Sequence, residues 1–458
     1  MTAAAAQPLP TPGRDWRELL QLAWPMLIGQ LAQIGMGVVD TVMAGAVGRT
    51  DLAAVAVGFS MWIPVYVMCL GVLSAVTATV ARAEGAKDRA ALAASVQQGL
   101  WLAGMLAAIA LTLMLRGDRL LAFMDVDPGV RPMAALYLDG MAIGTPAMML
   151  FLVLRGLSEG GGSSRPVMVI QVLAFLSNIP LNYLFIYGEL GLPALGGAGC
   201  GWASGFVMWI QLTALAVLTR RRWRPLLRGF GTVEPRRLWS MLRLGFPVGA
   251  AMFAETSIFA LVALLIGSLG ATTLAAHQIA LNFSALLFMV PTSLGLALTV
   301  KVGHALGAGE PARARRYAAQ GAWSAVIFAS CSAFALLVFP HRIVSLYTAD
   351  EAVRQLAVSI LAYSAAFQLS DGLQVTAAGS LRGYHDTRMT MVITLLAYWG
   401  VGMPMGYALG LTDWLGPRQG VLGLWTGLVA GLTVAALLLN ARLVRTANRH
   451  LRERPTAV

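Results

Sequence analysis

The sequence of 458 residues has few charged residues, few cysteines and almost no lysine. Only 12% of the residues are charged, whereas soluble domains carry about a quarter, and 58% are hydrophobic. This balance excludes a water-soluble globular protein, a disordered chain and a disulfide scaffold, and it leaves a polytopic membrane protein. Cys69, Cys200 and Cys331 lie far apart in apolar segments, which favours buried free thiols over a metal or redox site.

The only lysines are Lys87 and Lys301, and neither lies in a Gly-Lys-Ser/Thr sequence. A P-loop requires that sequence, and no loop is long enough for an ATPase domain, so a primary pump is excluded. A membrane enzyme needs a polar catalytic cluster, and no His-x-x-x-Asp or Gly-x-Ser-x-Gly pattern occurs near the middle of the apolar segments. We therefore expect a protein that is not an enzyme and has no organic cofactor.

A transmembrane helix needs about 20 apolar residues. Internal Gly and Pro and flanking Trp and Tyr favour helices over barrel strands in this chain. The segment MTAAAAQPLPTPGRDW lacks the features of a cleavable signal peptide, so we expect the first span to direct insertion. Twelve spans are predicted, at roughly 19–44, 53–79, 91–115, 132–154, 166–187, 201–219, 244–266, 273–299, 317–340, 355–379, 389–410 and 421–441.

The net charge of +12 comes from basic residues in short stretches between the apolar segments. This distribution indicates membrane loops rather than a nucleic-acid surface. Most of the Lys and Arg residues fall on the side of the two termini, above all in residues 220–243 and 442–458. The positive-inside rule therefore predicts a multi-pass membrane protein with both termini in the cytoplasm.

The sequence also contains an internal repeat. At an offset of 222 residues, Pro25 aligns with Pro247 and Trp101 with Trp323. The chain is thus predicted to be an all-α integral membrane protein of two six-helix lobes, related by a pseudo-two-fold axis along the membrane normal. Transporters of this design bind substrate between the lobes. The predicted parts are an N-terminal tail (1–17), a first lobe (18–219), a basic linker (220–243), a second lobe (244–441) and a basic tail (442–458).

Three carboxylates lie deep in the apolar segments: Asp40, Glu255 and Asp371. A charged side chain at the centre of a transmembrane helix costs at least about 2.5–3.5 kcal/mol of insertion free energy, so each of these carboxylates is a candidate functional residue. No Lys or Arg lies in an apolar segment at comparable depth, so we expect these groups either to stay protonated or to hold an exchangeable cation. The alternative is a protonated carboxyl group that is hydrogen-bonded to a backbone carbonyl.

Two asparagines of the fifth span are candidate partners of Asp40. Asn178 and Asn182 are four residues apart, flank Pro180 and should face one side of the helix. Hydrogen bonding between helices is the alternative role. Candidate residues for the lining of a drug pocket, with packing or lipid contact as the alternative, are Gln33, Phe259, Phe288 and Phe367.

Several motifs together resemble those of the multidrug and toxic compound extrusion (MATE) transporters, NorM-like branch. The resemblance extends along essentially the whole chain. The motifs are Trp24-Pro25-Met26, Val39-Asp40-Thr41-Val42-Met43-Ala44-Gly45, Asn178-Ile179-Pro180-Leu181-Asn182-Tyr183, Ala254-Glu255-Thr256, Leu274-Ala275-Ala276-His277-Gln278 and Ser370-Asp371-Gly372.

The resemblance implies a cation-coupled antiporter that exports bulky cationic and aromatic drugs by alternating access, and we expect it to act as a monomer without a nucleic-acid partner. In that family a first-span aspartate works with polar residues of the fifth span, which Asp40, Asn178 and Asn182 match. Some members have a second aspartate in place of Asn182. The NorM-like branch has an acidic site in the C-terminal lobe, which Glu255 and Asp371 match and where Na⁺ is expected to bind, although proton coupling also occurs.

The alternative function is a lipid-linked oligosaccharide flippase of the same wider superfamily. Such flippases tend to need positive charge in the central cavity to hold a pyrophosphate. The candidate cavity residues here are acidic, which favours a cationic solute.

Overall fold

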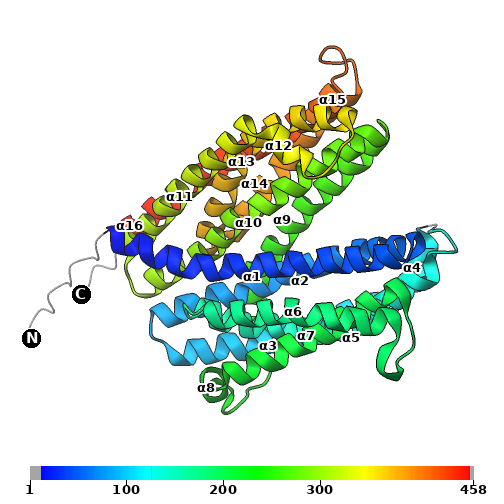
Figure 1. The fold of residues 1–458 in the computed structure, drawn as a ribbon. Helices are drawn as coiled ribbons and strands as arrows, with labels where there is room; N and C mark the ends of the chain where they lie inside the picture. The colour runs from blue at the N-terminus through cyan, green and yellow to red at the C-terminus, as the bar shows by residue number, and fades with distance from the viewer. Residues whose placement is uncertain (1–11, 125, 454–458) are drawn as a thin grey trace, which may run out of the picture.

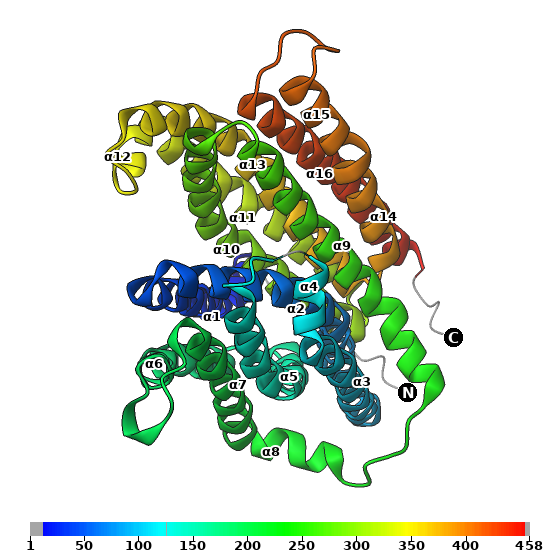
Figure 2. The same ribbon diagram turned by 90° about the vertical axis from the view of Figure 1, so that its right-hand side faces the viewer.

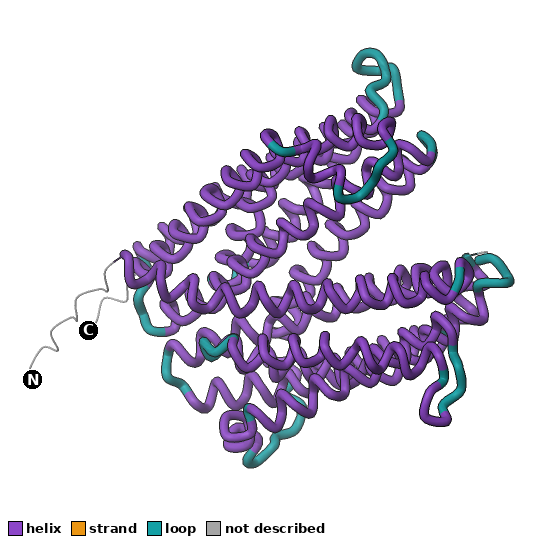
Figure 3. The backbone as a smooth tube through the Cα atoms, viewed as in Figure 1, coloured by secondary structure: helices purple, strands orange, loops and turns teal. Residues whose placement is uncertain are grey.

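The computed structural model describes residues 12–124 and 126–453, so residues 1–11 of the predicted N-terminal tail and the last five residues lie outside the described part. The described residues form helices joined by loops and contain no strand (Figure 3). Twelve of the helices are long and apolar enough to cross a membrane. The predicted number of spans and the all-α fold class are confirmed.

The first six spans form the N-terminal lobe. A short helix, α4 (Gly117–Phe123), follows the third span, and two 3₁₀ turns, η1 (Glu189–Gly191) and η2 (Gly196–Ala198), lie between the fifth spanning helix and the sixth. The spanning helices are α1 (Pro12–Val47), α2 (Arg49–Gly85), α3 (Arg89–Leu115), α5 (Arg131–Gly160), α6 (Arg165–Tyr187) and α7 (Gly199–Leu218).

The last six spans form the C-terminal lobe. The linker between the lobes contains α8 (Arg220–Trp223) and η3 (Arg224–Leu227), and α12 (Pro340–Ser345) lies between the ninth and tenth spans. The eleventh span consists of α14 (Thr387–Leu395), the π-helix η4 (Leu396–Gly402) and α15 (Met403–Leu411). The other spans are α9 (Pro235–Gly267), α10 (Ala271–Gly307), α11 (Pro311–Val338), α13 (Glu351–Gly383) and α16 (Val421–Arg452).

The two lobes use the same helix pairs. In the N-terminal lobe α2 packs on α5, and α5 packs on α7; in the C-terminal lobe α10 packs on α13, and α13 packs on α16. Likewise, α1 pairs with α6 as α9 pairs with α14. The structure therefore has the duplicated six-helix architecture that the repeat predicted.

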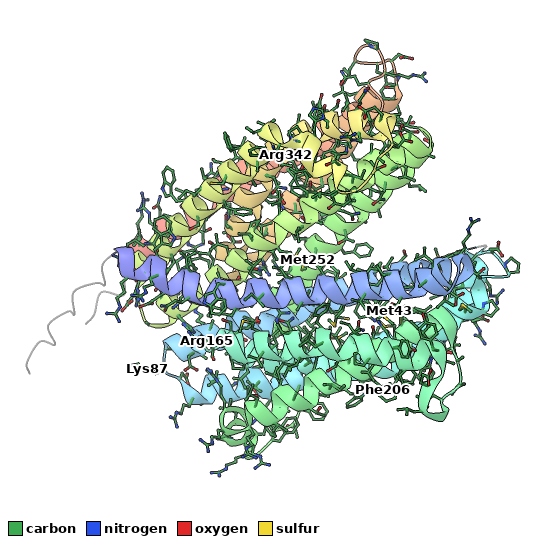
Figure 4. All side chains as sticks on the ribbon, in the orientation of Figure 1. Met43, Lys87, Arg165, Phe206, Met252 and Arg342 are labelled. Atoms are coloured by element: carbon green, nitrogen blue, oxygen red, sulfur yellow. The ribbon has the colours of Figure 1, made fainter. Side chains whose placement is uncertain are left out.

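The lobes meet at the end of the molecule that carries the termini and diverge toward the other end (Figures 1 and 2). The main contacts between the lobes join α1 and α2 of the N-terminal lobe to α9 and α10 of the C-terminal lobe. Lys87 and Arg165 lie at the end of the molecule near the termini (Figure 4). We call this end the terminus side.

Several helices extend beyond the predicted spans, and α9 and α16 do so by the most residues at one end. The twelfth span was predicted to end at residue 441, but α16 continues to Arg452, and α9 begins at Pro235 inside the predicted linker. Hydropathy marks where a helix leaves the apolar core, whereas the helix continues as long as its residues favour helical geometry. The added turns are rich in arginine, a good helix former.

The contact between α2 and α9 depends on glycine. A Cβ atom on Gly71 would collide with the backbone of Gly249 across the lobe interface. We expect Gly71→Val to destabilise the protein by about 1–3 kcal/mol, because the helices must separate to accept the side chain. Thermal unfolding of the purified protein measures this effect. Gly104→Val is the matched control, since its Cβ would meet nothing within 4 Å; equal melting temperatures for the two variants would contradict the prediction.

Candidate functional site

Asp40 lies on α1 and is only 8% exposed. Its Oδ1 accepts a hydrogen bond from Asn182 Nδ2 at 2.6 Å, and its Oδ2 accepts one from Ser204 Oγ at 3.2 Å. Asn182 Nδ2 also donates to Asn178 Oδ1 at 3.1 Å. The structure thus brings Asp40 together with both predicted asparagines, and it adds Ser204 of α7, which the sequence analysis did not identify.

The spacing of the asparagines explains this N-terminal cluster. Asn178 and Asn182 are one helical turn apart on α6, so both amides face α1. Both side chains are fully buried, and Asn182 Oδ1 has no hydrogen-bond partner among the described residues. The cluster therefore has a carboxylate that two donors hold in place and an amide oxygen that is free to coordinate a cation or to accept a hydrogen bond.

Asp371 lies on α13 and is 1% exposed. Neither of its carboxylate oxygens has a hydrogen-bond partner among the described residues. Glu255 of α9 is close enough to Asp371 for the two carboxyl groups to interact electrostatically. An ionised carboxylate in this position carries a large desolvation cost, so Asp371 needs a bound proton or cation to be stable.

Tyr398 adds a hydroxyl group to this C-terminal cluster. Its hydroxyl donates to Gln374 Oε1 at 2.7 Å and is also a hydrogen-bond neighbour of Glu255. A tyrosine hydroxyl has one proton, so Tyr398 can donate to Gln374 or to an ionised Glu255 but not to both at once. Tyr398 lies in the π-helix η4, and such distortions are frequent at functional sites. The sequence analysis missed Tyr398 and Gln374; a Tyr and a Gln inside apolar spans were the available signal.

The expectation that no basic residue lies near these carboxylates is wrong for Glu255. Arg382, in the last turn of α13, is within electrostatic range of Glu255. The long arginine side chain extends beyond its own turn of helix, which the position in the sequence does not indicate. In the N-terminal lobe, Arg155 of α5 is buried and forms an ion pair with Glu159, with an Nε–Oε1 distance of 2.9 Å.

The predicted lining residues have different environments. Gln33 is half-buried, and its Nε2 donates to the Tyr66 hydroxyl at 2.9 Å. Phe367 is only 5% exposed and packs edge-to-face against Phe259, with ring centroids 6.0 Å apart, in the core of the C-terminal lobe. Phe288 is half-buried on α10. Phe367 therefore contributes to core packing in this conformation.

The two clusters differ from a multi-carboxylate metal centre. Within the described residues, no three His, Cys, Asp or Glu side chains are grouped closely enough to hold a metal ion. Each cluster instead combines one or two carboxylates with neutral oxygen donors inside a membrane-spanning lobe. Two lobes that diverge from a shared interface, each with a buried acidic cluster, define the chain as a polytopic membrane transporter of the two-lobe type.

The chain belongs to the MatE family, whose model matches residues 25–184 and 247–408, once in each lobe. It is 47% identical over 444 residues to the multidrug resistance protein PmpM of Pseudomonas aeruginosa, covering 96% of this chain and 93% of the relative. It is 43% identical over 440 residues to the probable multidrug resistance protein NorM of Shewanella oneidensis, covering 94% and 95%. The predicted resemblance is confirmed.

The fold is also that of solved MATE structures. A multidrug resistance MATE family transporter of the MOP superfamily, solved in an outward-facing conformation, superposes with a TM-score of 0.86 at 19% identity, over 96% of this chain and 97% of that one.

Proposed function

We propose that the protein is a secondary active exporter that couples the entry of Na⁺ or H⁺ to the extrusion of bulky cationic and aromatic drugs. The relatives named above are multidrug resistance proteins, which supports drug export. It acts as a monomer in the inner membrane of a bacterium, with both termini in the cytoplasm, so the diverging end of the lobes faces outward. Alternating access then requires the lobes to separate on the terminus side and to close at the other end.

The observation that carries the coupling proposal is Asp371, a buried carboxyl group with two unpartnered oxygens. The Asp40 carboxylate already accepts hydrogen bonds from Asn182 and Ser204, so it gains less from an additional cation. We therefore assign the exchangeable ion to the C-terminal cluster, with Asp371 and Glu255 as its carboxylate ligands. A cationic drug that competes for the same negative charge favours release of the ion, and this competition gives antiport by linkage.

The flippase alternative has less support. A pyrophosphate needs unpaired positive charge, but Arg155 is neutralised by Glu159, and Arg382 lies within electrostatic range of the Glu255 carboxylate. Asp371 contributes a negative charge that no described side chain pairs with in the C-terminal lobe. Both observations favour a cationic solute.

Ethidium efflux from proteoliposomes tests the proposed function. A Na⁺ gradient and a pH gradient are imposed separately on wild type, Glu255→Gln and Asp40→Asn. We expect one of the gradients to drive efflux. Glu255→Gln should reduce the rate by about 100-fold, because a hydrogen bond or ion contact to a charged group contributes about 1.5–3 kcal/mol. Asp40→Asn should reduce the rate by roughly tenfold or less, because the Asp40 carboxylate already has hydrogen-bond donors and depends less on a bound cation.

Three outcomes would count against parts of this proposal. Efflux that is driven normally in Glu255→Gln and lost in Asp40→Asn would move the coupling site to the N-terminal cluster. Efflux that neither gradient drives would reject cation coupling. The absence of ethidium movement, together with flipping of a lipid-linked sugar by the same liposomes, would reject drug export.

A further inference from the structure

A second candidate site lies on the terminus side of the C-terminal lobe, away from both acidic clusters. It is a cavity of about 340 Å³ between α16 and the connection from α13 to α14, a size typical of ligand sites, which span roughly 300–1,000 Å³. We call it the α16 cavity. Basic side chains and one tyrosine dominate its lining, namely Tyr384, His385, Arg442, Arg445, Arg449 and His450.

Three arginines and two acidic residues line the α16 cavity, so one arginine has no acidic partner there. Arg442 Nε binds Asp386 Oδ2 at 2.6 Å, and Arg449 Nε binds Glu453 Oε1 at 2.7 Å. Arg445 lines the same cavity and has no ion-pair or hydrogen-bond partner among the described residues. The cavity therefore offers a guanidinium group to an anion, and a guanidinium fork matches the geometry of a phosphate.

Tyr384 provides a second, independent indication of a ligand. The residue is only 4% exposed, and its hydroxyl has no hydrogen-bond partner among the described residues. Its ring packs against His450, with ring centroids 5.2 Å apart, which holds the side chain in the cavity wall. Neighbouring atoms cover the hydroxyl in this conformation. Because buried hydroxyl groups are nearly always hydrogen-bonded, a small rotation that brings it to the cavity would let an acceptor there satisfy it.

We propose that the α16 cavity binds a phosphate-bearing anion through Arg445 and the Tyr384 hydroxyl. A phospholipid headgroup is the source that the surface favours, because exposed apolar residues of α16 lead to the cavity. Val444 adjoins Arg445, and Leu438 lies seven residues earlier on the same helix face; both are exposed. An acyl chain along this face would place its phosphate at Arg445. Basic pockets beside transmembrane helices on the cytoplasmic side commonly bind anionic headgroups.

Native mass spectrometry of the full-length protein in detergent tests the proposal. The probes are dioleoyl phosphatidylglycerol, dioleoyl phosphatidylcholine and inorganic phosphate. We expect one retained phosphatidylglycerol per chain and weaker retention of phosphatidylcholine. Arg445→Gln should weaken phosphatidylglycerol binding about tenfold, and Tyr384→Phe by several-fold, because each removes one hydrogen-bonding group from a charged ligand. Arg165→Gln is the matched control, since Arg165 is also an exposed arginine of the terminus side.

Each result supports the proposal or overturns it. If millimolar inorganic phosphate displaces phosphatidylglycerol and binds with the same dependence on Arg445, the site is supported and its ligand is a soluble phosphate. If Arg445→Gln and Tyr384→Phe bind phosphatidylglycerol as tightly as wild type and Arg165→Gln, the proposal is overturned. Equal binding of phosphatidylcholine would overturn it as well. Should Arg445→Gln fail to fold, Tyr384→Phe decides, because it removes a single oxygen atom.

Discussion

Replacing Asp371 with asparagine is expected to abolish ion-driven ethidium efflux, with a fall of about 100-fold in the initial rate, equivalent to roughly 2.7 kcal/mol of lost ion binding. Asparagine has nearly the same shape as aspartate but has no charge and does not take up a proton in the working range of pH. The substitution therefore removes the exchangeable group without leaving a cavity. Since Asp371 is fully enclosed and unpartnered, its loss leaves Glu255 as the only carboxylate of the proposed ion site.

Both the transport rate and the thermal stability of Asp371→Asn are measured. Efflux from proteoliposomes gives the rate, and thermal unfolding shows whether the variant is folded; we expect the melting temperature of Asp371→Asn to match or exceed that of wild type, because an uncompensated buried charge destabilises the native state. Asp139→Asn is the control, since Asp139 is also a carboxylate within a span but is exposed. Normal efflux by Asp371→Asn would remove Asp371 from the coupling site.

The fold was largely predictable because two long-range signals are present in the chain itself. Segments of about 20 apolar residues must become helices in a bilayer, and the repeat that aligns Pro25 with Pro247 fixes how the lobes are related. The ends of α9 and α16 were not predictable from the same signals, because both helices continue into polar surroundings where hydropathy gives no information.

The two acidic clusters were predictable to different degrees. Asn178 and Asn182 share a helix face, so local spacing alone brings them together. Tyr398 and Gln374 belong to different helices, and their hydrogen bond depends on how η4 packs against α13, which no local pattern encodes. The reach of Arg382 to Glu255 is likewise a property of side-chain direction in three dimensions.

An ionic cluster that joins the lobes on the terminus side also depends on tertiary structure. Asp15 and Glu18 of α1 face Arg313 of α11, with Nε–Oδ1 and Nη2–Oε2 distances of 2.9 and 3.1 Å. Lys301 of α10 and the Tyr317 hydroxyl also bind Glu18 Oε2, at 3.3 and 2.9 Å. These contacts connect the two lobes, and under the proposed alternating-access mechanism they must break whenever the terminus side opens.

The repeat shows that this ionic cluster is specific to one side of the lobe interface. At the offset of 222 residues, the equivalent of Arg313 is Ala91 and the equivalent of Asp15 is Arg237. Other contacts between the lobes do follow the repeat: Arg82 of α2 hydrogen-bonds His385, while its equivalent in α10, His304, donates to the carbonyl oxygen of Gly160. The charge cluster is thus an addition to a symmetric interface, which fits a role in setting the conformational equilibrium.

We expect Arg313→Ala to shift that equilibrium toward the conformation that is open on the terminus side by about 2 kcal/mol, or roughly a 30-fold change in the population ratio. The full Coulomb energy is not lost, since the Arg313 side chain is partly exposed and screened. Double electron–electron resonance between labels at Arg165→Cys and Arg388→Cys measures the separation of the lobes on this side. A Cys331→Ser background is needed because Cys331 is exposed, contrary to the expectation of three buried thiols.

The control for this distance measurement is a variant that loses an ion pair away from the lobe interface. Arg418→Ala removes an ion pair with Asp413 that is exposed and lies within one lobe, so its distance distribution should match that of wild type. Because Glu18 retains Lys301 and Tyr317 in Arg313→Ala, the lobes should still close in part, and both populations should be visible. Identical distributions for wild type and Arg313→Ala would mean that the glycine-mediated contact between α2 and α9 holds the lobes together without the ionic cluster.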